Sequence, residues 1–161
     1  MSIKERFEEH IFDLQDRICA ALETSDGLGR FEEDKWERPG GGGGRTRILN
    51  KGKVIEKGGV NVSVVHGELP QIFIEKFKVE EATFYACGLS LVIHPFSPKV
   101  PTVHANWRYF EMYDSEGNLQ TSWFGGGSDL TPYYLDEEDA KHFHSINKAI
   151  CDQHHADYYP C

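Results

Sequence analysis

Residues 82–113 read ATFYACGLSLVIHPFSPKVPTVHANWRYFEMY and carry a clear pair of strand signals. The first half, up to His94, is a long and mainly apolar run, which is typical of a strand in the middle of a sheet. The second half, from Thr102, alternates apolar and polar residues, which indicates a strand with one side facing solvent. Prolines separate the two halves and favour a turn. We therefore expect the end of the first strand, at His94, to lie beside the second strand.

Helical patterns lie toward the two ends of the chain. In residues 3–22 apolar residues recur at spacings of three and four, as in an amphipathic helix. Ser2 is a suitable N-cap for this helix, and the Ser-Asp-Gly sequence at 25–27 ends it. A second helical pattern covers residues 136–154, with Asp136 as its N-cap and further acidic residues in its first turn.

The segments between these helices predict further strands. Residues 30–38 resemble a short charged strand, and residues 45–69 resemble a hairpin or meander with breaks at Lys51-Gly52 and Gly58-Gly59. The sequence DSEGN at 114–118 predicts a turn before a strand at 120–124, and GGGSDLTP at 125–132 predicts the end of that strand. The order of helix, strands and helix favours an α+β fold with a large, mostly antiparallel β-sheet flanked by helices.

Composition limits what the chain can do. Its 161 residues, 39% of them hydrophobic, suit a single domain over residues 1–161. A net charge of −9 makes it a poor binder of nucleic acid, which needs clustered Lys and Arg. No run approaches the roughly 18 apolar residues of a membrane span. The acidic N-terminus does not resemble a leader sequence. We therefore expect a cytoplasmic protein that has no membrane span and whose four cysteines are free thiols.

Three polar residues of the second strand share one face. His104, Asn106 and Arg108 are spaced by two, so they project together as an acid–base group, an amide and a carboxylate-binding fork. The alternative is an ordinary solvent-facing strand, because alternation alone also predicts a polar face. The opposite face of the same strand would hold Trp107, Tyr109 and Glu111.

Two glycine-rich segments are further candidates for ligand contact. Asp129 lies among three glycines, a proline and aromatic residues, where it could bind a flat ligand that bears N–H groups, or merely cap a turn with Thr131. The run RPGGGGGRTR at 38–47 is either a flexible linker or a place where backbone amides approach a ligand beside Arg45 and Arg47.

The histidines are weak candidates for metal ligands. His94 and His104 lie ten residues apart and could converge if adjacent strands carry them. His142 and His144 lie two residues apart on a predicted helix, so at most one of them can join His94. Surface or hydrogen-bonded core histidines are the alternative.

Three long motifs together resemble one family. They are KWERPGGGGGRTRILNKGKVIEKGGVNVS at 35–63, SLVIHPFSPKVPTVHANWRYFE at 90–111 and WFGGGSDLTPYYLDEEDAKHFH at 123–144. In this order they resemble the oxygen-dependent coproporphyrinogen III oxidases of haem biosynthesis. The resemblance implies oxidative decarboxylation of two propionates of coproporphyrinogen III to vinyl groups, which gives protoporphyrinogen IX. It also implies molecular oxygen as oxidant, a broad antiparallel sheet flanked by helices, and a homodimer.

The resemblance also implies roles for single residues. His104 corresponds to a proposed proton donor, and Asp129 to an acid that holds pyrrole N–H groups. His94 and His144 correspond to ligands of a divalent metal cation. Substrate-binding positions correspond to Ser90, Asn106, Trp107 and Arg108. Because the substrate is anionic and the chain acidic, Arg45 and Arg47 are expected to join Arg108 in binding it.

Members of this family continue for a long further stretch, so we expect the chain to be the N-terminal half of such an enzyme and inactive alone. We expect no required cofactor besides oxygen. Two alternatives stay open at this point. One is a non-haem metal-dependent oxygenase that uses His94, His104, Glu111 and His144. The other is a fragment that binds tetrapyrroles, or is purely structural, without catalysis.

Overall fold

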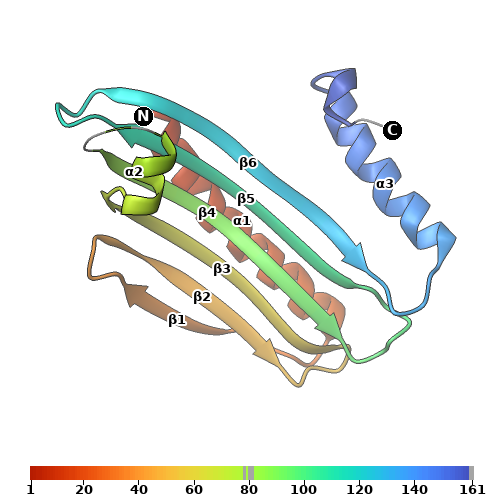
Figure 1. The fold of residues 1–161 in the computed structure, drawn as a ribbon. Helices are drawn as coiled ribbons and strands as arrows, with labels where there is room; N and C mark the ends of the chain where they lie inside the picture. The colour runs from red at the N-terminus through yellow and green to blue at the C-terminus, as the bar shows by residue number, and fades with distance from the viewer. Residues whose placement is uncertain (78, 80–81, 160–161) are drawn as a thin grey trace.

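A computed structural model describes residues 1–77, 79 and 82–159. One six-stranded sheet forms the centre of the molecule, and its strands lie in chain order with every neighbouring pair antiparallel (Figure 1). The strands are β1 (Glu32–Glu37), β2 (Gly42–Asn50), β3 (Ile55–Glu68), β4 (Thr83–Pro95), β5 (Thr102–Tyr113) and β6 (Leu119–Thr131). The helices are α1 (Ile3–Asp26), α2 (Gln71–Phe77), α3 (Glu137–Asp152) and a 3-10 turn, η1 (Ala156–Tyr158). The predicted α+β fold with an antiparallel sheet and flanking helices is confirmed.

Helix α1 begins as predicted and ends later than its apolar pattern does. The side chain of Ser2 accepts a hydrogen bond from the Glu5 backbone while the Glu5 side chain accepts one from the Ser2 backbone, which is a complete capping box. The helix runs on to Asp26 because Gly27 adopts a left-handed conformation, φ 80°, and stops it there.

The predicted strands are present, but two predicted breaks are wrong. Gly58 and Gly59 lie inside β3, where pairing with both β2 and β4 offsets the low strand preference of glycine. The glycines at 125–127 continue β6, which reaches Thr131. A side chain at Gly126 would overlap the backbone oxygen of Asn106 across the strand pair, so close approach of β5 and β6 requires a glycine there.

The two faces of the sheet have different surroundings (Figure 1). Helix α1 lies across one face, which we call the helix-covered face, and buries a core there. We call the opposite face the open face. Within the described part of the chain, only α2 covers it, near one end. The sequence did not predict α2. Helix α3 starts where predicted and extends beyond the β6 edge. The buried residues of the main core are Ile11, Cys19, Leu49, Ile55, Val60, Val62, Tyr85, Cys87, Leu89, Ile93 and Tyr109.

Two smaller expectations concern cysteines and membranes. Cys19, Cys87 and Cys151 are free thiols, while Cys161 lies outside the described residues. Across the described residues no helix combines the length and apolar character that crossing a membrane requires.

Candidate functional site

A histidine and an aspartate meet on the open face between β5 and β6. His104 and Asp129 are register partners, and His104 Nδ1 lies 2.8 Å from Asp129 Oδ1. The hydroxyl of Thr131, two residues along β6, donates to the same oxygen at 3.3 Å. The side chains are 42% and 61% exposed. The pair is therefore preorganised by the strand register and still accessible to a ligand.

An arginine and an asparagine lie beside this pair. Arg108 Nη2 donates to Asn106 Oδ1 at 2.9 Å, and Ser90 on β4 is the register partner of Asn106. These three residues line a hollow of about 260 Å³ on the open face. In the described parts of the chain no carboxylate lies within ion-pair distance of Arg108, so its guanidinium can bind an anion.

Trp107 also borders this hollow, but its side chain does not face the same way as those of Asn106 and Arg108. It alternates with Asn106 and Arg108 along β5, so its side chain projects from the helix-covered face, where it is 39% exposed. The structure thus brings together His104, Asn106, Arg108, Asp129 and Ser90, and it places the indole on the other side of the sheet.

Arg45 and Arg47 also lie on the helix-covered face, and both are engaged there. Arg45 Nη2 lies 2.8 Å from Asp16 Oδ1, and Arg47 Nη1 lies 2.7 Å from the same oxygen. Arg47 also donates two hydrogen bonds to Glu33, which lower the pKa of that carboxyl below its usual value. These arginines tie α1 to β1 and β2, opposite Arg108. We therefore leave them out of the site, against the sequence prediction.

The predicted metal ligands do not converge. His94 lies near His104, with ring centroids 6.4 Å apart, and its Nδ1 lies 3.4 Å from the Thr102 hydroxyl. His144 lies on α3, where its Nδ1 contacts the hydroxyl of Tyr159. No cluster of three or more His, Cys, Asp or Glu side chains suited to a metal ion occurs among residues 1–77, 79 and 82–159. His94 and His144 as metal ligands therefore stay a prediction.

Glu111 excludes the alternative oxygenase ligand set. It lies on the helix-covered face, is 6% exposed, and accepts hydrogen bonds from the hydroxyls of Tyr109 and Tyr113. Burial, together with this carboxylate, raises the pKa of Tyr113 to about 12. A ligand set of His94, His104, Glu111 and His144 would need Glu111 on the same side as His104, and the sheet separates them.

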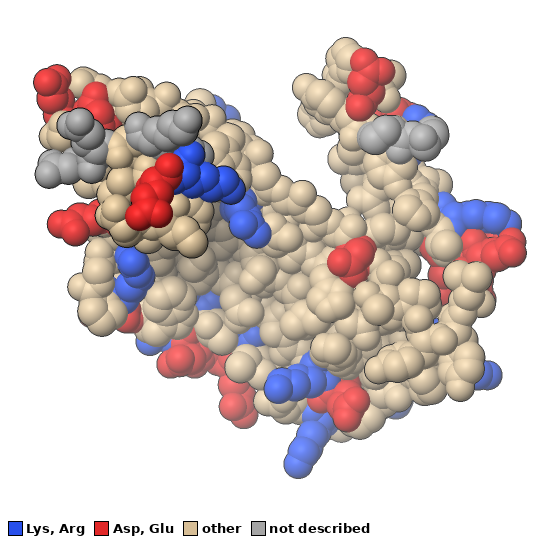
Figure 2. All heavy atoms as spheres, viewed as in Figure 1, with Lys and Arg blue, Asp and Glu red and all other residues tan. Residues whose placement is uncertain are grey.

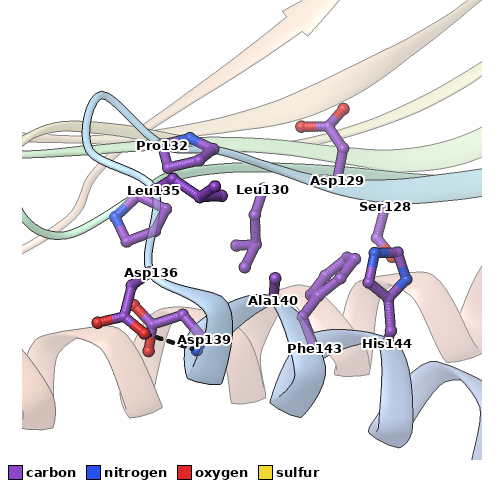
Figure 3. A pocket seen from close by; sticks show the side chains of 11 residues that line it. Ser128, Asp129, Leu130, Pro132, Leu135, Asp136, Asp139, Ala140, Phe143 and His144 are labelled. Carbon is purple, nitrogen blue, oxygen red and sulfur yellow. Dashed lines mark hydrogen bonds between the residues drawn. The ribbon is translucent and has the colours of Figure 1, made fainter.

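Figure 3 shows how Asp129 is aimed. Its carboxylate points away from a pocket of about 310 Å³ that lies between β6 and α3, whereas Leu130 points into that pocket toward Ala140 and Phe143. The Ser128 hydroxyl donates to Asn147 of α3 at 3.2 Å. Strand alternation therefore separates the residues that hold α3 from the carboxylate that serves the open face.

The open face as a whole suits a large, mostly uncharged ligand with a few anionic groups. Figure 2 views this face and shows a broad, largely uncharged surface between α2 and α3, with separate charged side chains across it and around its ends. Two polar residues of this face, Lys57 and Asn61 on β3, were missed by sequence reasoning. The alternation of residues 60–65, VNVSVV, was the available signal for Asn61.

Comparisons with known proteins agree on one family. The sequence pattern described as "Coproporphyrinogen III oxidase" matches residues 6–161. The chain is 48% identical over 169 residues to a chloroplastic oxygen-dependent coproporphyrinogen-III oxidase of Glycine max and 46% over 173 residues to a chloroplastic one of Nicotiana tabacum. It is 47% identical over 168 residues to an oxygen-dependent coproporphyrinogen-III oxidase of Drosophila melanogaster. These matches cover 99% of the chain and 43–44% of each relative. The chain thus spans less than half the length of these relatives.

Proposed function

The chain belongs to the coproporphyrinogen III oxidase family, and on that premise we propose that its open face binds coproporphyrinogen III. The reaction would be the oxygen-dependent oxidative decarboxylation of two propionates to vinyl groups, giving protoporphyrinogen IX in haem biosynthesis. The observation that carries the proposal is the His104–Asp129 pair, which lies beside an uncommitted arginine on an accessible sheet face.

Arg108 would bind a propionate of the substrate. The guanidinium fork matches a carboxylate, and the amide of Asn106 accepts one of its N–H groups and so fixes its orientation. The chain carries a net charge of −9, so binding an anion requires a local cation of this kind.

Asp129 would hold the macrocycle through its pyrrole N–H groups. A carboxylate offers two oxygens with several acceptor positions, and His104 and Thr131 both contact Oδ1, which leaves Oδ2 for the ligand. A negative charge at this position would also stabilise positive charge that develops on a pyrrole as electrons leave it.

His104 would move a proton at the reacting side chain. Because an ionised carboxylate only accepts hydrogen bonds, Nδ1 carries the proton toward Asp129, and Nε2 is the nitrogen that faces the ligand. Each propionate that becomes a vinyl group loses carbon dioxide and one hydrogen from its carbon chain, and two electrons pass to molecular oxygen. A positioned imidazole can accept or return the proton of that step.

The remaining features are proposals of the same kind. The names of the relatives support molecular oxygen as the oxidant, and we propose no required metal. A homodimer is the proposed assembly of the full-length protein. We also propose a cytoplasmic location, although two of the relatives above are named as chloroplastic.

Anaerobic titration tests the proposal directly. Coproporphyrinogen III is added to the 161-residue chain without oxygen, and tryptophan fluorescence or calorimetry reports binding. We expect saturable binding that Asp129→Asn and Arg108→Leu weaken, while Arg47→Leu, the same change on the helix-covered face, leaves affinity unchanged. Equal affinity in all four proteins would remove the open face as the binding site.

A binding fragment without catalysis is the second candidate, favoured by the coverage of less than half of each relative. Exposure of the saturated complex to air distinguishes the two. Formation of protoporphyrinogen IX by this chain would show that the residues present suffice for catalysis, and binding without product would support the fragment.

A further inference from the structure

A second hollow lies on the open face, across β2, β3 and β4. It has a volume of about 430 Å³, and its lining includes Thr46, Lys57, Gly59, Asn61, Val92 and His94. We infer that this hollow is a second subsite, in which Lys57 binds a carboxylate of the substrate and Asn61 accepts a hydrogen bond from a ligand N–H. This inference rests on the proposed function, and it adds two binding residues that neither sequence reasoning nor the comparisons supplied.

Asn61 has an acceptor with nothing to bind. Its Oδ1 is buried and has no hydrogen-bond partner, and it is the one side-chain atom of this kind within the described residues. A buried polar atom without a partner costs about 1–3 kcal/mol, so proteins rarely retain one without a reason. Because Oδ1 can only accept, the missing partner is a donor, and a pyrrole N–H is the donor that the proposed substrate offers.

Lys57 is a cation without an anion. In the chain as described, no carboxylate lies within ion-pair distance of its ammonium group. Its register partner on β4 is His94, so it lies at the far end of the hollow from Asn61. In a protein with a net charge of −9, a basic side chain left unpaired beside a hollow is suited to attract an anionic ligand.

The register places the two hollows at opposite ends of one polar row. Asn61, Ser90 and Asn106 pair directly across β3, β4 and β5. Arg108 belongs to a neighbouring row, Ser63–Gly88–Arg108, which lies two residues along β3 from Asn61. Lys57 lies four residues from Asn61 along β3 in the opposite direction. Six residues of strand separate Lys57 from Ser63, which at about 3.3 Å per residue is roughly 20 Å.

That separation identifies what each cation binds. One carboxylate cannot contact two cations so far apart. A macrocycle that lies between the two cations can offer each of them a carboxylate from a different pyrrole ring. Lys57 and Arg108 would therefore fix the rotation of the macrocycle on the sheet. Such a two-ended clamp selects tetrapyrroles with propionates on separate rings.

Anaerobic calorimetry with coproporphyrinogen III tests the inference on the 161-residue chain. Lys57→Met is expected to raise the dissociation constant about tenfold, as the loss of a charge-assisted hydrogen bond does, and to weaken its dependence on salt. The matched control is Lys53→Met, which removes an exposed lysine outside the hollow and should change neither quantity.

Asn61→Val separates a binding role from a structural one. Removing an unpaired buried acceptor removes its desolvation cost, so the melting temperature should stay constant or rise while the affinity falls. A lower melting temperature with unchanged affinity would give Asn61 a structural role and overturn its assignment.

The outcomes also separate this inference from the proposed function. If Arg108→Leu weakens binding but Lys57→Met behaves like Lys53→Met, the second subsite is wrong and the proposed function stands. If the wild-type chain does not bind coproporphyrinogen III, both are wrong.

Discussion

The two faces of this sheet use the same residue types in opposite ways. On the helix-covered face Arg45 and Arg47 have carboxylate partners at 2.7–2.8 Å. On the open face Arg108 and Lys57 have none among the residues that the structure describes. The faces are separated only by the alternation of side chains along shared strands.

The difference teaches which polar groups hold the fold together and which remain free to bind a ligand. Beneath α1, polar side chains form hydrogen bonds within the protein. Gln15 donates to the backbone oxygens of Arg45 and Val60 at 2.8 and 2.7 Å and accepts a hydrogen bond from the Arg45 side chain. On the open face, some hydrogen-bonding groups are still available to a ligand: the unpaired oxygen of Asn61 and the accessible His104–Asp129 pair. Changes on one face should therefore alter stability, and changes on the other should alter binding.

The largest loss of stability is expected for Asp26→Ala, where α1 ends. The Asp26 carboxylate is 2% exposed and accepts hydrogen bonds from the backbones of Leu28, Gly29, Lys53, Val54 and Ile55. Alanine would leave these donors without a partner, so the melting temperature should fall more than in any variant below. Affinity of the folded fraction for the ligand should not change. A melting temperature within a degree of the wild type would contradict this account.

The same carboxylate predicts how stability depends on pH. Hydrogen bonds from the backbone of Ile55 and its neighbours hold the pKa of Asp26 well below its ordinary value of 3.8. A lowered folded-state pKa contributes stability that is full above the unfolded-state pKa and is lost as the pH falls through the folded-state value. Urea unfolding should thus show stability falling below about pH 4, and Asp26→Asn should lack that part of the slope.

A smaller but still substantial loss is expected for Gln15→Leu. Gln15 is fully buried, and leucine would leave two backbone oxygens and the Arg45 side chain short of a partner. We expect the free energy of unfolding to fall by about 3 kcal/mol, measured by urea denaturation. If ligand affinity fell instead, with stability unchanged, the assignment of the helix-covered face to stability would be wrong.

Replacing one arginine on each face by leucine tests the difference between the two faces further. Arg108→Leu should weaken binding of coproporphyrinogen III about tenfold, or about 1.4 kcal/mol, and leave the melting temperature nearly unchanged. Arg47→Leu should do the reverse, because it breaks contacts with Asp16 and Glu33. Calorimetry and thermal melts on both variants provide the measurement, and parallel effects of the two changes would erase the distinction between the faces.

The smallest effect is expected at the start of α1. Ser2→Ala removes the capping box, which should cost about 1 kcal/mol of stability. Glu5→Gln is a milder control, since its side chain can still accept from the Ser2 backbone. Thermal melts would detect the difference, and equal melting temperatures in the wild type and Ser2→Ala would show that the cap contributes nothing.

Much of the site followed from alternation within single strands. The common face of His104, Asn106 and Arg108 needed only a period of two, and the structure confirms it. The contact between His104 and Asp129 could not be predicted, because it depends on the register between β5 and β6. The glycines at 125–127 resemble a loop, so the sequence predicted that the strand ends before Asp129, whereas these glycines pair with β5.

Other features that the sequence did not reveal have the same physical origin. Nothing in the local sequence of Arg45 and Arg47 states which face of the sheet they occupy, since this depends on pairing with Val62 and Val60. Helix α2 was missed because its seven residues are too few to establish a helical period. Long periodic segments such as α1 were predictable, and relations between segments were not.

The central claim is that the ligand binds the open face. Intermolecular NOEs in the anaerobic complex of coproporphyrinogen III with the methyl-labelled chain test it most directly. Val92 and Ile48 carry methyl groups on the open face, and Val60 and Leu89 carry buried ones beneath α1. The account predicts NOEs from the macrocycle to Val92 and Ile48 and none to Val60 or Leu89. NOEs confined to methyl groups of the helix-covered face would contradict it.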